Sequence, residues 1–230
     1  SDLDAVQAFG KVESPIAGSA VDMISVSAHK VHGPKGIGAL IVLNKNLLKD
    51  GMRPLIWGGE QEGGFRSGTQ NAGLIAGFHA AAQETLGRRS ETFRYVSTLQ
   101  KQFRELLMAR GLLHEDPAKS LFSWNSPAEA VPQIVSLSFL QLAPGKPATY
   151  VPSGLLAKML EERGCLVSTG SACSSKKVEP DAVLKAMGLP DLVCTSSLRV
   201  SFSDSNRPED VQMLVKAMDE SIQMLRQMLG

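Results

Sequence analysis

Several features that mark other classes of protein are missing from this chain of 230 residues. The formal net charge is only +1, so the composition predicts neither a basic nucleic-acid-binding surface nor an acidic tail. No apolar run reaches the roughly 20 residues that a membrane-spanning helix needs. We therefore expect neither a nucleic acid nor a membrane among the partners of this protein.

Cysteine is also scarce. The three cysteines, Cys165, Cys173 and Cys194, are odd in number and show no CxxC spacing, which argues against a disulfide framework and against a zinc site. This usage fits a reducing compartment. We expect a cytoplasmic protein with no bound metal, and an organelle matrix would give the same cysteine pattern.

An α/β pattern occupies the first ninety or so residues. Residues 21–26 (VDMISV) predict a strand, and residues 38–43 (GALIVL) form a continuous apolar run, as expected of a strand buried on both faces of a parallel sheet. The alanine-rich residues 69–86 predict a helix. We therefore interpret residues 1–92 as part of a layered α/β domain.

The rest of the chain has a different character, and we assign residues 93–230 to a smaller α+β domain. A long helix is expected over residues 90–111, with Ser90 as its cap, and a loop over residues 114–130. The later elements are expected as strands over 133–140 and 197–203 and as helices over 153–163, 179–187 and 207–229.

Lys30 lies in the segment SAHKVHGPKGIG, between an apolar strand and a glycine-rich turn. The lysine should therefore lie at the carboxyl end of a strand, where open α/β sheets bind ligands. Ser27 and His29 can donate hydrogen bonds to an anion such as a phosphate, and the glycines let the backbone approach a ligand closely. A solvated loop lysine is the alternative that this pattern alone leaves open.

Asp4 and Gln7 follow another strand-like segment, in the sequence DAVQ. A site for pyridoxal 5'-phosphate (PLP) needs a lysine for a Schiff base and an acid that keeps the pyridine nitrogen protonated, so that the ring accepts electrons. Asp4 can supply that acid, and Gln7 can donate a hydrogen bond to the phenolate oxygen of the ring. An ordinary aspartate at a strand end is the alternative.

A glycine-rich run over residues 58–69 leads into the helix predicted at residues 69–86. Free backbone N–H groups, the helix dipole and the Thr69 hydroxyl together favour an anion at such a point.

Cys173 lies among small polar residues in the segment STGSACSS, which predicts an exposed loop. Free cysteines are usually buried as small hydrophobic residues, and we expect this for Cys165 and Cys194. A cysteine in an exposed loop is a candidate nucleophile.

The strand at residues 197–203 alternates in polarity, so that Leu198, Val200 and Phe202 should face one way and Ser197, Arg199 and Ser201 the other. Arg199 thereby falls on the polar side, where a guanidinium can capture a carboxylate through two hydrogen bonds. A surface ion pair is the alternative.

Taken together, these segments resemble the cysteine desulfurases, in the class V aminotransferase group of fold type I PLP enzymes. The matching stretches occur in the order found in that family and span nearly the whole chain: DAVQAFGK, SAHKVHGPKGIGAL, RSGT, GSACSS with VEPDAVLKAMGL, and SSLRVSFS. The resemblance implies part of a fold type I large domain followed by a smaller α+β domain.

The resemblance also implies roles for particular residues. Lys30 would form the Schiff base with PLP, and Asp4 and Gln7 would contact the pyridine nitrogen and the phenolate oxygen. Ser27 and His29 would hold the phosphate, and Thr69 would reach the phosphate of a neighbouring subunit in a homodimer. Arg199 would bind the carboxylate of the L-cysteine substrate. Cys173 would take the sulfur as a persulfide, leaving alanine, and pass it to a sulfur-acceptor or iron–sulfur scaffold protein.

Some positions depart from the family pattern. Glu60 and Gly63 stand where that pattern favours glycine and arginine. The family's ring-stacking histidine and main phosphate-binding loop precede the region that resembles this chain. We therefore expect the chain to be a C-terminal portion that by itself binds PLP weakly or not at all. A related PLP enzyme such as a selenocysteine lyase, and a non-catalytic dimerising or scaffold-binding module, are the alternatives.

Overall fold

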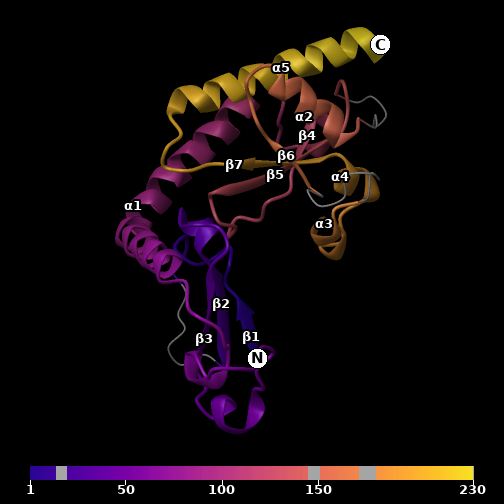
Figure 1. The fold of residues 1–230 in the computed structure, drawn as a ribbon. Helices are drawn as coiled ribbons and strands as arrows, with labels where there is room; N and C mark the ends of the chain where they lie inside the picture. The colour runs from indigo at the N-terminus through magenta and orange to yellow at the C-terminus, as the bar shows by residue number, and fades with distance from the viewer. Residues whose placement is uncertain (14–19, 145–150, 171–179, 230) are drawn as a thin grey trace. The chain divides into compact units, whose positions relative to one another are not determined.

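The fold is that of a computed structural model, which describes residues 1–13, 20–144, 151–170 and 180–229. The chain divides into two compact units, residues 1–91 and 92–230 (Figure 1).

The first unit contains a three-stranded sheet made of β1 (Asp2–Asp4), β2 (Met23–Ser27) and β3 (Gly38–Val42) in that order. β1 runs parallel to β2, and Asp4 pairs with Ser25. β2 alternates as a half-buried strand should, since Ile24 and Val26 are buried and join a small core in which the rings of Phe9 and Phe78 lie 6.3 Å apart.

A tight turn joins β2 to β3 through the 3₁₀ helix η1 (Ala28–Val31). His32 has a φ of +64°, and the Gly33 N–H donates to the carbonyl of Ala28 at 2.9 Å. Gly38 lies so close to β2 that a Cβ there would come within 2.5 Å of the Val26 carbonyl oxygen. A side chain at position 38 would therefore force the two strands apart.

The expectation for β3 was wrong in two respects. β3 pairs antiparallel to β2, with Gly38 opposite Ser27, and its residues Gly38 to Ile41 are exposed. The apolar run correctly predicted a strand, but burial on both faces requires covering layers, and among the described residues none covers β3.

The long helix α1 (Ala72–Ala109) replaces the two helices predicted over residues 69–86 and 90–111. Ser90 lies inside this helix and is not its cap. No proline interrupts the stretch, and a serine costs only a few tenths of a kcal/mol inside a helix, so the helix continues past it. The part of α1 in the first unit packs on the turn after β2, where Thr85 Oγ1 donates to the Val31 carbonyl at 3.2 Å.

The second unit is built on a four-stranded antiparallel sheet in the order β4-β5-β7-β6. The strands are β4 (Phe122–Trp124), β5 (Ile134–Phe139), β6 (Ser168–Thr169) and β7 (Ser197–Ser201). The helices are α2 (Ser153–Glu161), α3 (Ala182–Ala186), α4 (Asp191–Thr195) and α5 (Pro208–Leu229). Short helical turns elsewhere in the chain are η2 (Leu47–Gly51), η3 (Glu62–Gly64) and η4 (Pro117–Lys119).

One face of this sheet is apolar and forms the main core with α2, α5 and the second part of α1 (Figure 1). Phe103 is fully buried, and its ring centroid lies 5.6 Å from that of Phe202 and 6.1 Å from that of Trp124. Truncating a phenylalanine packed in this way to alanine costs about 3–5 kcal/mol. The second unit therefore has a sizeable core of its own.

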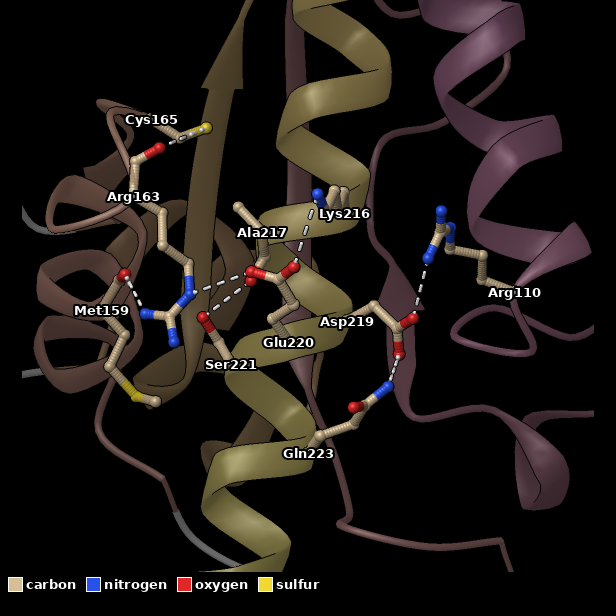
Figure 2. Close-up of polar contacts among 10 residues, drawn as sticks. All are labelled: Arg110, Met159, Arg163, Cys165, Lys216, Ala217, Asp219, Glu220, Ser221 and Gln223. Atoms are coloured by element: carbon tan, nitrogen blue, oxygen red, sulfur yellow. Dashed lines mark hydrogen bonds and ion pairs between the residues drawn. The ribbon is translucent and has the colours of Figure 1, made fainter.

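Ion pairs connect the helices at the surface of this core (Figure 2). Arg110, just after α1, bonds to Asp219 of α5 at 2.9 Å, and Arg163, just after α2, lies 3.6 Å from Glu220 of α5. These side chains are partly solvated, so each pair contributes about 1 kcal/mol or less. The apolar face, and not the ion pairs, holds the helices in place.

Several predictions for the second unit are confirmed, including the strands at residues 133–140 and 197–203 and the closing helix at 207–229. Others were incomplete. β4 lies inside the predicted loop at 114–130 because Phe122 pairs with Phe139 and packs against its ring. α4 was missed, since five residues are too few to show a helical period.

Candidate active site

Two strand ends of the first unit meet at one edge of its sheet. Because β1 and β2 are parallel, Asp4 at the end of β1 and Ser27 at the end of β2 lie at the same edge. Lys30 follows directly, on η1, and is half-buried. The local structure thus brings three of the predicted cofactor residues to neighbouring strand ends.

Ser27 and His29 form a pair at this edge. Ser27 Oγ lies 2.7 Å from His29 Nδ1. His29 Nε2 has no hydrogen-bond partner among the described residues, and the His29 side chain is exposed. The pair can therefore present an N–H or O–H donor to an anion.

Asp4 is only partly engaged by the protein. Its Oδ1 accepts a hydrogen bond from the Val6 N–H at 3.0 Å, which orients the carboxylate. Its Oδ2 has no partner within the described part of the chain, and the side chain is exposed. One carboxylate oxygen is therefore held and the other is left to accept a proton donor.

Gln7 is oriented by a residue that sequence reasoning missed. Lys11 Nζ donates to Gln7 Oε1 at 3.1 Å, and with the oxygen engaged in this way the Gln7 amide nitrogen is left as the donor. The pKa of Lys11 is lowered from its ordinary value, chiefly by burial and then by the charge of Lys30. Lys11 and Lys30 therefore lie within each other's electrostatic field.

Thr69 is exposed and lies three residues before α1 begins. One N–H of the first turn of the helix is satisfied by Asn71, whose Oδ1 accepts from the Leu74 N–H at 3.1 Å. The glycine-rich run before Thr69 is held by its own contacts, such as the Gly68 N–H donating to Gln61 Oε1 at 2.9 Å. No hydrogen bond joins Thr69 to Lys30 in the part of the chain that the structure describes.

The two departures from the family pattern fall on an unusual backbone conformation. Glu60 has a φ of +62° and Gly63 a φ of +64°, in the left-handed region that favours glycine. The glycine that the family pattern favours at position 60 suits this conformation, and glutamate does not.

Arg199 lies on β7 in the second unit, where the register sets it opposite Ser136 of β5 and Ser168 of β6. The side chain is half-buried, and no acidic partner is found for it among the described residues. An arginine on a strand face beside small hydroxyl side chains can take a carboxylate that the protein itself does not supply.

A buried polar network lies on the same face of this sheet and was also missed. Asn125 Nδ2 donates to Ser138 Oγ at 2.7 Å, and Ser138 Oγ donates to the Val193 carbonyl of α4 at 2.6 Å. Asn125 Oδ1 is buried without a partner in the described structure. The network holds α4 against β5, next to the strand that carries Arg199.

Cys173 lies outside the described residues. The other two thiols are buried, as predicted, with Cys165 6% exposed and Cys194 2% exposed. Burial raises the pKa of both thiols above the ordinary value. Cys165 Sγ faces the Arg163 carbonyl near the end of α2 (Figure 2).

Among the described residues, no cluster of three histidine, cysteine or acidic side chains could hold a metal ion. Among the same residues, no helix combines the length and the apolar character needed to cross a bilayer.

A family model for class V aminotransferases matches residues 2–214. The chain belongs to the class V aminotransferase family. The match includes the strand ends around Asp4 and Lys30 and the strand that carries Arg199.

Curated relatives of this class V aminotransferase chain bear the name cysteine desulfurase. The mitochondrial protein of Saccharomyces cerevisiae is 33% identical over 225 residues, which are 98% of this chain and 41% of the relative. The protein of Enterobacter agglomerans is 33% identical over 223 residues, 97% of this chain and 50% of the relative. The chain thus spans about half the length of the curated relatives that it matches.

Solved structures of other proteins are also similar to this chain. A NifS-like protein matches with a TM-score of 0.76 at 30% identity, covering 97% of this chain and 52% of the other. The NifS-like protein of Rickettsia africae gives a TM-score of 0.76 at 25% identity, covering 97% of this chain and 53% of the other. The predicted fold class, part of a fold type I PLP enzyme, is confirmed by these similarities.

Proposed function

We propose that the complete protein acts as a PLP-dependent cysteine desulfurase, which removes sulfur from L-cysteine and leaves L-alanine and an enzyme persulfide. The observation that carries the proposal is the arrangement at the edge of the first sheet, where Lys30 follows β2 and Asp4 ends the parallel strand β1. The 33% identity to proteins named cysteine desulfurase, over nearly the whole chain, supports the same activity.

The donor set at this edge fits PLP. Lys30 would hold the aldehyde carbon, Asp4 the protonated pyridine nitrogen, and Gln7 the phenolate oxygen through the amide nitrogen that Lys11 leaves free. Ser27 and His29 would donate to the phosphate. When bound, the cofactor would supply an electron sink for charge that develops at the substrate Cα.

The side chains of the protein would then carry out separate steps of the reaction. Arg199 would fix the substrate carboxylate, and the Lys30 amine would take the proton from Cα and return a proton when the product forms. The Cys173 thiolate would attack the substrate sulfur, so that the Cβ–S bond breaks, an S–S bond forms, and the electron pair left at Cβ is protonated. The products of this balance are alanine and a Cys173 persulfide.

Partners and compartment belong to the same proposal. We expect a sulfur-acceptor or iron–sulfur scaffold protein to take the persulfide sulfur, and the cytoplasm to supply the reducing conditions. A homodimer is supported by an apolar segment just before the glycine-rich run, in which Leu55 is 97% exposed and Trp57 is 76% exposed. Side chains of this kind usually mark an interaction surface when they gather in one segment.

The test uses this chain alone and the same chain preceded by the N-terminal part that its relatives carry. Each is given PLP and L-cysteine, and alanine and sulfide are measured. Borohydride reduction and peptide mapping should find a pyridoxyl group on Lys30 in the longer protein. The variant Lys30→Ala should lose the group and the activity, whereas Lys35→Ala, in the exposed turn that follows, should keep both. A pyridoxyl group elsewhere, or no alanine from the longer protein, would overturn the proposal.

The alternative of a selenocysteine lyase is separated by Cys173→Ala. A desulfurase should lose sulfur transfer from cysteine in this variant and keep the pyridoxyl group on Lys30. An enzyme that acts on selenocysteine without using Cys173 should be unaffected.

A further inference from the structure

The second unit has a small pocket whose lining does not include Arg199. It has a volume of about 210 Å³ and lies between the end of α1, the segment that follows it, and β4. An engineered cavity of about 150 Å³ is large enough for benzene. This pocket therefore has room for one small ring with a short substituent.

Arg104 brings an unmatched positive charge to the pocket. Its guanidinium carbon lies 5.4 Å from the centroid of the Trp124 ring, in a cation–π contact that holds the group over the indole face. Arg104 has no acidic partner in the described part of the chain. By contrast Lys101, on the same helix, and Arg110, just after it, pair with Glu105 and Asp219.

His114 adds a second donor to the lining. Its Nδ1 accepts the Asp116 N–H at 3.0 Å, so the neutral imidazole carries its proton on Nε2 and can donate there. The His114 N–H donates to the buried Ser120 Oγ at 3.0 Å, and this hydrogen bond holds the backbone at His114 in place. The backbone that carries the Nε2 donor is therefore fixed.

The other lining residues determine which kind of ligand fits the pocket. Met108 and Leu140 give the pocket apolar walls beside the Trp124 ring. Glu115 also lines it and has no basic partner among the described residues, so it repels a dianion more strongly than a monoanion. We propose that this pocket binds a small monocarboxylate with an apolar ring or branched body, the carboxylate on Arg104 and His114 and the body against Trp124 and Met108.

The test uses the full chain and phenylacetate as the probe. The chain has two tryptophans, so Trp57→Phe leaves Trp124 as the single fluorophore. Phenylacetate should change the Trp124 emission saturably and shift the Met108 methyl signal in NMR spectra. Benzyl alcohol, which lacks the charge, and inorganic phosphate, which carries more of it, should each bind at least about ten-fold more weakly.

Two variants in the same background locate the site. Arg104→Gln should weaken phenylacetate binding by about ten-fold or more, the usual size of a charge-assisted hydrogen bond. Arg110→Gln, just after the end of α1 and paired with Asp219 outside the pocket, should leave phenylacetate binding unchanged. The proposal is overturned if the parent gives no saturable signal, if Arg104→Gln binds like the parent, or if benzyl alcohol or phosphate binds as well as phenylacetate. Since the proposed desulfurase activity is measured separately, neither result depends on the other.

Discussion

Gly170 and Asp181 lie in direct contact, so close that a Cβ on Gly170 would come within 2.6 Å of Asp181 Oδ2. Each is anchored by its backbone, since the Gly170 N–H donates to the Ser197 carbonyl at 3.2 Å and the Asp181 N–H to the Cys194 carbonyl at 3.1 Å. These two residues stand on either side of the segment that contains Cys173. Gly170 and Asp181 are therefore held on β7 and α4.

The variant Gly170→Ala should disturb this contact. A Cβ would meet Ser197 Oγ at 2.2 Å as well as Asp181, and overpacking of this kind costs about 1–3 kcal/mol. We expect the free energy of unfolding, measured by urea denaturation, to fall by that amount. Gly154→Ala is the matched control, because a Cβ at that exposed position of α2 meets nothing within 4 Å. Equal effects of the two substitutions would contradict the contact.

The strained backbone at Glu60 predicts a substitution that stabilises the protein. Since Glu60 has a φ of +62°, replacing it with glycine removes a penalty of about 1 kcal/mol for a side chain in the left-handed region. Glu60→Gly should therefore raise the urea midpoint. Glu84→Gly, at an exposed position inside α1, should lower it by a similar amount, because glycine is unfavourable in a helix. A lower urea midpoint for Glu60→Gly would show that the backbone at Glu60 is not strained.

The sequence carried more information about the second unit than about the first. The alternation around Leu198 and Val200 reflects the two faces of a sheet whose core is present in the chain, and both residues are buried. The apolar run at β3 was typical of a strand with both faces covered, yet Leu40 is 50% exposed. The periodicity of apolar residues indicates which faces of a strand require burial. It does not indicate whether the chain contains the residues that cover those faces.

At the candidate site the sequence predicted the residues that would touch a ligand and missed those that hold them. Lys11 stands four residues after Gln7, a spacing that predicts contact only where the backbone turns helically. Asn125 is distant in sequence from β5 and α4, which its hydrogen-bond network joins, so no local pattern could indicate it. Asp181 caps α3, which a local pattern can indicate, but its contact with Gly170 is not local. Ser197 was expected on the polar face and is 2% exposed, because Gly170 packs against it.

Lys11 should make stability depend on pH. Its pKa is lowered in the folded state by burial and by Lys30, so between that lowered pKa and the ordinary value near 10.4 the unfolded chain binds more protons. Stability attributable to Lys11 should therefore rise with pH through this window. Urea midpoints measured from pH 7 to pH 11 should show a smaller rise in Lys11→Met than in the parent. Lys35→Met, at an exposed position, should show the same rise of the urea midpoint as the parent. An equal rise in Lys11→Met and in the parent would show that the Lys11 pKa does not contribute to the pH dependence of stability.

Alkylation should separate the three cysteines. Burial raises the pKa of Cys165 and Cys194 and keeps both from reagent, so the native chain treated with iodoacetamide at pH 7.5 should be labelled first at Cys173. Peptide mass spectrometry would give the labelling rate at each position. In urea the three rates should converge. Faster native labelling of either buried thiol would remove the reason for assigning the nucleophile to Cys173.

The role of Arg199 can be tested in the longer, active protein with a change that keeps the charge. Lysine offers a point charge in place of the planar fork that binds both carboxylate oxygens, so Arg199→Lys should raise the KM for L-cysteine about ten-fold or more and change kcat less. Cysteamine has no carboxylate, so any turnover of it should be equal in the parent and in the variant. Arg207→Lys, exposed just before α5, should leave the KM unchanged. If Arg199→Lys lowered the turnover of cysteamine as much as that of cysteine, the arginine would be supporting the strand and not holding the substrate.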